Sequence, residues 1–255
     1  MRNESIRPKR FATRIALLLV GIILTLVAAA LGWWTATAYQ ADATALAAVA
    51  DSDGPADGVV VRQLDDGSLA FIANDPVAGM VFYPGGNVEP EAYAPLLTLC
   101  AQKGLTTVLV RPPLRFSLLD VDAASSATAQ FPNIDRWLLA GHSLGGVAAC
   151  ECLSKHTSDY DAITLLASFP NTDLTTYEGT VLQLVGTEDG VLSRNSYEEA
   201  RTLLPDGAQE HMIEGGNHAQ FGNYGEQAGD KEALITREEQ QDETAADIVA
   251  LVQQE

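Results

Sequence analysis

The sequence predicts an α/β protein with a mostly parallel sheet of about eight strands, helices on both faces and one transmembrane helix ahead of the domain. Three observations lead to this prediction: an uncharged apolar run near the N-terminus, a hairpin pattern after it, and short apolar runs that alternate with helical patterns over the rest of the chain. With 255 residues, of which 47% are hydrophobic, the chain can build a sizeable core.

The N-terminal segment has the pattern of a membrane anchor. Residues 1–14 form a basic arm with five Lys and Arg residues and one acidic residue, and the 20 residues from 15 to 34 carry no charge. A run of this length spans a bilayer as a helix, and the basic flank predicts a cytoplasmic N-terminus. We therefore expect a single-pass protein of the cell membrane with an extracytoplasmic domain. The alternative is a signal peptide cleaved near Ala36-Thr37-Ala38, which exports the domain equally.

Residues 35–58 are rich in Ala, Asp and Gly, and we interpret them as a juxtamembrane linker, either a short helix or a flexible tether. The domain is expected at residues 59–255. It opens with two β-type segments, 59–61 and 69–72, on either side of the turn Asp65-Asp66-Gly67. This pattern predicts an antiparallel hairpin at an edge of the sheet.

Strands and helices alternate beyond the hairpin. Six strands are expected at 80–83, 107–110, 137–140, 163–167, 181–185 and, more weakly, 211–213. Helices are expected at 89–103, 120–129, 144–156, 196–204 and 236–253, and the last begins with the capping box Thr236-Arg237-Glu238-Glu239. The loop 168–179 between two strands is too short for a helical lid.

Charge and cysteine content limit the partners. A net charge of −19 argues against nucleic acid as a partner, because phosphates are repelled. We interpret Cys100, Cys150 and Cys152 as small buried residues, with a bridge from Cys100 to one of the other two as the alternative. No His or Cys spacing typical of a metal site is present, so we expect no metal and no cofactor.

The segment Gly141-His142-Ser143-Leu144-Gly145 matches the G-x-S-x-G pattern of a nucleophile elbow. It follows a predicted strand and opens a predicted helix, which is the context that this turn requires. Ser143 is therefore the candidate nucleophile, and the N–H of Leu144 is the first candidate donor to an oxyanion. A second donor is expected from the loop Tyr83-Pro84-Gly85-Gly86-Asn87, through the N–H of Gly86 or of Asn87.

A base and an acid follow the serine along the chain. Of the four histidines, His218 alone lies in the loop after the last weak strand, and it is the candidate base. Glu188 and Asp189 both follow the strand 181–185, and either could hold the histidine.

Residues 59–253 resemble a small, lidless α/β-hydrolase of the dienelactone-hydrolase kind. The segments Tyr83-Pro84-Gly85-Gly86, Gly141-His142-Ser143-Leu144-Gly145-Gly146 and Gly216-Asn217-His218-Ala219-Gln220-Phe221 carry the resemblance. It implies the chain order Ser, Asp, His and favours Asp189 as the acid, because Gly186-x-x-Asp189 resembles the corresponding turn of this superfamily. Dienelactone hydrolases have a cysteine as nucleophile, whereas this chain has Ser143, so their substrate is not implied.

The predicted function is hydrolysis of carboxylic esters, with a small ester-type molecule as substrate. Ser143, His218 and Asp189 are expected to form the triad and an acyl-enzyme, with Leu144 and Gly86 or Asn87 at the oxyanion. The alternatives are a lactonase or thioesterase of related chemistry, or a surface binding module without catalysis.

Overall fold

The computed structural model describes residues 7–50 and 58–253, and it divides the chain into two units, Met1–Ala38 and Tyr39–Glu255. The first unit contains helix α1 (Arg7–Ala36), in which the 24 residues Thr13–Ala36 are long and apolar enough to cross a membrane. A signal sequence has the same properties. Residues 1–6 of the expected basic arm and 51–57 of the expected linker lie outside the described residues.

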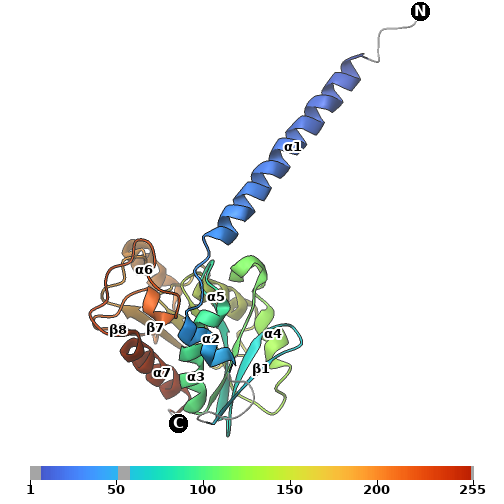
Figure 1. Cartoon of the computed structure of the whole chain (residues 1–255). Coiled ribbons are helices and arrows are strands. Elements are labelled where there is room, and N and C mark those ends of the chain that lie inside the picture. Colours follow the sequence, from blue (N-terminus) through green and yellow to red (C-terminus); the bar gives the residue numbers. More distant parts are fainter. Residues whose placement is uncertain (1–6, 51–57, 254–255) are drawn as a thin grey trace, which may run out of the picture. The chain divides into compact units, whose positions relative to one another are not determined.

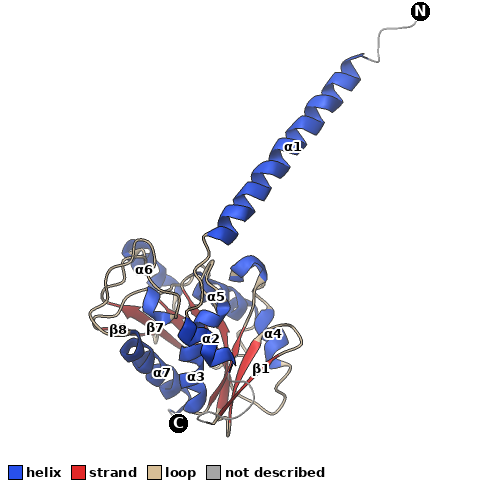
Figure 2. Ribbon diagram, viewed as in Figure 1, coloured by secondary structure: helices blue, strands red, loops and turns tan. Residues whose placement is uncertain are grey.

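An eight-stranded sheet forms the centre of the second unit (Figure 2). Its spatial order is β1-β2-β4-β3-β5-β6-β7-β8. The pairs β1/β2 and β2/β4 are antiparallel and every later pair is parallel, which confirms the predicted hairpin at a sheet edge. The strands are β1 (Val59–Gln63), β2 (Leu69–Ala73), β3 (Ala78–Tyr83), β4 (Leu105–Leu109), β5 (Trp137–His142), β6 (Ala162–Leu166), β7 (Thr180–Gly186) and β8 (Gln209–Ile213).

Helices cover both faces of this sheet, as predicted (Figure 1). The helices of the unit are α2 (Ala43–Ala50), α3 (Ala94–Gln102), α4 (Ala123–Thr128), α5 (Leu144–Lys155), α6 (Arg194–Ala200) and α7 (Arg237–Gln253). Helices α2, α3 and α7 share one apolar core with the sheet, and α4 and α5 share the other. Along β3, Met80 and Phe82 enter the first core, whereas Val81 and Tyr83 enter the second.

Local sequence explains where α7 begins. The Thr236 hydroxyl accepts a hydrogen bond from Glu239 N (3.2 Å), and the Glu239 carboxylate accepts one from Thr236 N (2.8 Å), so the predicted capping box is present. The bond from Thr236 N lowers the pKa of the Glu239 carboxyl. Among the described residues, the connection 167–179 between β6 and β7 has turns and bends but no helix.

Residues 39–50 contact the domain, although composition indicates a linker there. Tyr39 N donates to Asn87 O (2.9 Å), and Tyr39 O accepts from Glu89 N (2.9 Å). Ala45 of α2 is fully buried in the core shared with α3. The alanine-rich sequence gives no strong apolar face, so this packing has little signal in the composition. The folded unit of the structure begins at Tyr39, ahead of the start expected at Val59.

The three cysteines are buried, and none forms a disulfide bond. Burial raises the pKa of each thiol, that of Cys100 to about 12. They therefore occupy the core as small apolar residues, and the alternative disulfide is not formed in the structure.

Candidate active site

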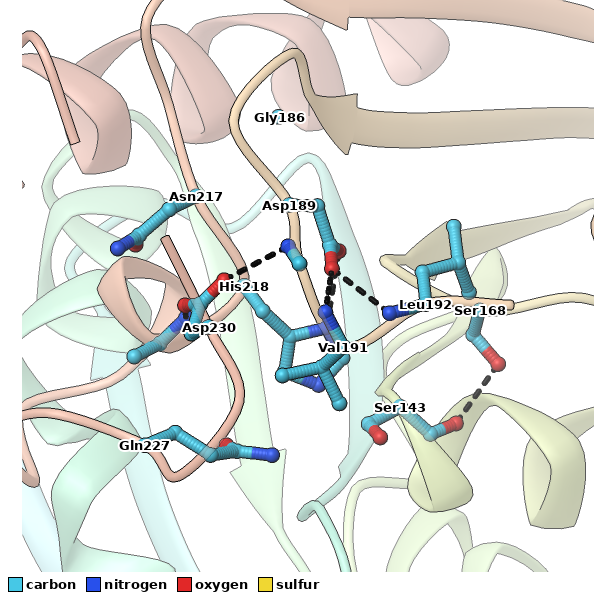
Figure 3. A network of polar contacts seen from close by, with 12 residues as sticks. Ser143, Ser168, Gly186, Asp189, Val191, Leu192, Asn217, His218, Gln227 and Asp230 are labelled. Carbon is cyan, nitrogen blue, oxygen red and sulfur yellow. Dashed lines mark hydrogen bonds and ion pairs between the residues drawn. The ribbon is translucent and has the colours of Figure 1, made fainter. Parts of the chain in front are cut away.

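The candidate nucleophile Ser143 lies in the sharp turn between β5 and α5, with φ 52° and ψ −123°. A positive φ is costly for a residue other than glycine, so surrounding contacts must hold it. Ser143 N donates to Leu166 O (2.9 Å), and the Ser168 hydroxyl donates to Ser143 O (2.7 Å; Figure 3). The turn is therefore fixed from β6 and the residues that follow it.

Gly145 allows the N-terminus of α5 to approach the loop after β3. A Cβ atom at this position would lie 2.1 Å from Tyr83 O and 2.5 Å from Pro84 O, which is closer than any side chain permits. A Cβ atom at Gly141 would lie 2.4 Å from the carbonyl carbon of Gly145. The glycines of the motif are therefore needed for packing, and they bring loop 84–87 beside the start of the helix.

The two candidate oxyanion donors in loop 84–87 differ in their contacts. Asn87 N donates to Arg115 O at 2.9 Å, so this N–H is already used. Gly86 N makes no hydrogen bond within the described part of the chain, and an ideal Cβ at Gly86 would lie 3.2 Å from Leu144 Cδ2. Leu144 is the first residue of α5, where N–H groups have no partner within the helix. The N–H groups of Gly86 and Leu144 are therefore available on neighbouring segments.

Asp189 and His218 come from the loops that follow β7 and β8, and the structure brings them together. His218 Nδ1 lies 2.9 Å from Asp189 Oδ2, and the two side chains are 1% and 0% exposed. Asp189 Oδ1 accepts hydrogen bonds from Val191 N and Leu192 N, each at 2.8 Å. Burial raises the pKa of the Asp189 carboxyl, but the His218 ring and these two N–H groups lower it by more than burial raises it. The pKa of Asp189 therefore lies below its ordinary value. The carboxylate is thus charged and fixed in orientation.

Glu188, the other candidate acid, faces a different partner. Its Oε2 lies 3.6 Å from Lys231 Nζ, and its side chain is 29% exposed. The structure therefore pairs His218 with Asp189 and leaves Glu188 in a partly exposed ion pair.

The second nitrogen of His218 faces the Ser143 side of the site. In Figure 3 the imidazole lies between Asp189 and Ser143. Its Nε2 is buried and has no hydrogen-bond partner among the described residues. The ring centroids of His142 and His218 are 4.5 Å apart, and His142 Nδ1 lies 2.8 Å from Tyr93 Oη. Burial, followed by the charge of His218, lowers the pKa of His142 well below its usual range, so His142 is neutral.

A small pocket of about 240 Å³ opens beside these residues. Its lining is mainly apolar and includes both Ser143 and His218. The lining residues are Ser143, Leu144, Val147, Ala167, Ser168, Phe169, Val191, Leu192, Ser193 and His218.

Comparison with known proteins shows the family of the chain. A sequence model described as the alpha/beta hydrolase family matches residues 79–242, which is more than half of the chain. The chain belongs to the alpha/beta hydrolase family. No match was found among curated proteins.

Solved structures share the fold of this hydrolase at low sequence identity. Dienelactone hydrolase from Anabaena variabilis aligns with a TM-score of 0.57 and 16% identity, over 77% of this chain and 98% of the other. Est1E from Butyrivibrio proteoclasticus aligns with a TM-score of 0.54 and 12% identity, over 77% of this chain and 100% of the other. An S-formylglutathione hydrolase from Agrobacterium tumefaciens aligns with a TM-score of 0.52 and 12% identity, over 78% of this chain and 97% of the other.

Three residues of the candidate site have no signature in the sequence. Ser168 fixes the carbonyl of Ser143, and Val191 and Leu192 both line the pocket and orient Asp189. Each acts through contacts with residues from another strand or through a backbone N–H, which any residue type supplies. Among the described residues, no group of three or more His, Cys, Asp or Glu side chains is arranged to hold a metal ion.

Proposed function

We propose that this hydrolase cleaves small carboxylic esters through a Ser143-His218-Asp189 triad. The observation that carries the proposal is the ordered series of contacts in the site. Asp189 bonds to Nδ1 of His218, and Nε2 of the same ring is left unbonded within the described residues, in a pocket that Ser143 also lines. This is the arrangement that a histidine base needs to accept a proton from a serine.

In the proposed reaction, Ser143 Oγ attacks the ester carbonyl carbon while its proton passes to His218 Nε2. The carbonyl oxygen becomes an oxyanion, which accepts hydrogen bonds from Leu144 N and Gly86 N. Asp189 stabilises the imidazolium, which then gives its proton to the departing alcohol. Water, activated by the same imidazole, attacks the acyl-enzyme and releases the acid. We choose Gly86 rather than Asn87 because Asn87 N already donates to Arg115 O.

Pocket size supports a short acyl group or a small lactone. A volume of about 240 Å³ is below the roughly 300–1,000 Å³ of typical drug-sized sites. Lactones and thioesters are acyl donors of the same type, and the structural neighbours include a dienelactone hydrolase and an S-formylglutathione hydrolase. Rates on p-nitrophenyl acetate, butyrate and palmitate, a γ-lactone and a thioester would order these substrates.

A fluorophosphonate probe tests the proposal directly. We expect full-length protein in detergent to be labelled on Ser143, because only an activated serine attacks the probe. The Ser143→Ala variant should show no label. Ser168 and Ser193 line the same pocket, so mass spectrometry of the modified peptide distinguishes the three serines. Absence of label in the folded protein would reject the triad and favour a binding role, whereas label on either other serine would reject Ser143 as the nucleophile.

We also propose that α1 anchors the hydrolase in the cell membrane, with the catalytic domain outside. The support is the apolar length of Thr13–Ala36 and the basic residues before it. The four lysines report the topology, because Lys9 precedes the span and Lys103, Lys155 and Lys231 follow it. An amine reagent that cannot cross membranes should modify the last three in intact cells, and Lys9 only after lysis. Modification of Lys9 alone in intact cells would reverse the proposed topology.

A further inference from the structure

The candidate acid and base lie on two separate loops, and a third segment connects them. The acid loop is residues 187–190 and the base loop is residues 214–219. We call residues 222–236, which follow the base loop, the strap. The strap is bonded to the base loop through Leu234 N, which donates to Gly215 O (2.7 Å), and through Asn217 Nδ2, which donates to Lys231 O (2.7 Å).

The strap also reaches the acid loop through two side chains: Lys231, whose Nζ lies 3.6 Å from Glu188 Oε2 in a partly exposed ion pair, and Asp230. Asp230 Oδ1 accepts a hydrogen bond from Gly190 N at 2.9 Å, and Asp230 Oδ2 accepts one from Ala219 N at 2.8 Å. Gly190 follows Asp189 and Ala219 follows His218, so one planar carboxylate bonds the residues next to the candidate acid and the candidate base. In Figure 3, Asp230 lies on the side of His218 away from Ser143, outside the reacting groups.

We propose that Asp230 is a positioning residue that keeps the acid loop and the base loop in register, so that Asp189 Oδ2 meets His218 Nδ1. This inference rests on the triad proposed above. On the N-terminal side of Asp189, Glu188 N donates to Gly216 O (2.8 Å) and already links the two loops. On the C-terminal side, Gly190 N donates to Asp230, which belongs to the strap. With Asp230 in place, the residues on both sides of Asp189 are hydrogen-bonded to neighbouring segments.

A carboxylate suits this position because two N–H donors converge on it. Each carboxylate oxygen accepts a hydrogen bond from one of the two loops, and the negative charge strengthens both hydrogen bonds. Lys231 N also donates to Asp230 Oδ1 (3.0 Å), which fixes the carboxylate within the strap. An asparagine at this position retains one oxygen and presents an NH₂ group to the other N–H, so one of the two loops loses its bond. The overall shape of the side chain is unchanged, and the substitution breaks the link without leaving a cavity.

The Asp230→Asn variant of the full-length protein in detergent tests this role. We expect kcat on p-nitrophenyl acetate to fall by about 10 to 100-fold while KM changes by less than about 3-fold, because misplacement of the base affects the chemical step more than substrate binding. The control is Asp66→Asn, which makes the same charge change in the β1–β2 turn, where Asp66 accepts only from Ser68 N (2.9 Å) among the described residues. It should retain the wild-type kcat.

A second readout does not depend on activity. The His218 Nδ1 proton, held between nitrogen and the Asp189 carboxylate, should give a low-field proton NMR resonance in the wild type that broadens or disappears in Asp230→Asn. An unchanged kcat and an unchanged resonance would overturn the proposal. So would a variant that fails to fold, because Asp230 would then act on stability. If the wild type shows the resonance but neither hydrolysis nor labelling, the proposed function fails, and the resonance of the variant alone decides the role of Asp230.

Discussion

The Ser143→Ala variant is expected to lower kcat/KM for a short-chain ester by roughly 10⁴ to 10⁶-fold, as loss of the nucleophile does in serine hydrolases. The reason is that Ser143 lies in a turn with a positive φ, which β6 and Ser168 hold in place. This turn presents the hydroxyl of Ser143 to the pocket that His218 also lines. No other pocket serine has this backbone conformation among the described residues. Initial rates with p-nitrophenyl acetate, corrected for spontaneous hydrolysis, measure the loss.

The matched control for this variant is Ser158→Ala. Ser158 lies in an exposed loop after α5 and bonds to Asp159 Oδ1 (3.1 Å). Removing this hydroxyl takes away the same atoms at a site remote from the pocket, and the rate should stay within about 2-fold of wild type. A Ser143→Ala variant that retains more than about one tenth of the wild-type rate would show that another residue attacks the ester.

Local patterns in the sequence predicted the sheet, because strands and tight turns are specified by residues that are close together along the chain. Short apolar runs on either side of Asp65-Asp66-Gly67 indicate the hairpin, and the five parallel strands β3 to β7 are mostly apolar. The capping box at Thr236 is equally local. Strand β8 is half exposed and less apolar, so its signal is weaker, although it was still found.

The choice between candidate site residues depends on distant contacts, which sequence patterns do not contain. Gly86 and Asn87 are equivalent in sequence, and they are separated by the bond from Asn87 N to Arg115 O. Glu188 and Asp189 are adjacent, and the direction of each side chain follows from the loop geometry after β7. Asp230 has no motif at all, because its partners are backbone N–H groups 40 and 11 residues away.

The acid is tested by two single substitutions that remove the same charge at adjacent positions. Asp189→Asn is expected to lower kcat/KM by about 10⁴-fold, as removal of the carboxylate does in serine proteases. Glu188→Gln should stay within about 3-fold of the wild-type kcat/KM, because the ion pair of Glu188 with Lys231 is partly exposed to solvent.

The contacts of Asp189 explain why an isosteric amide should be so damaging. Val191 N and Leu192 N both donate to Oδ1, so an asparagine would keep its carbonyl oxygen there and turn its NH₂ group toward His218 Nδ1. His218 would then carry its proton on Nε2, where it cannot accept the proton of Ser143, and no charge would stabilise the imidazolium. Rates of both variants on the same ester measure the effect. If Glu188→Gln lost the larger part of the activity, Glu188 would be the acid and the buried bond between Asp189 and His218 would be structural.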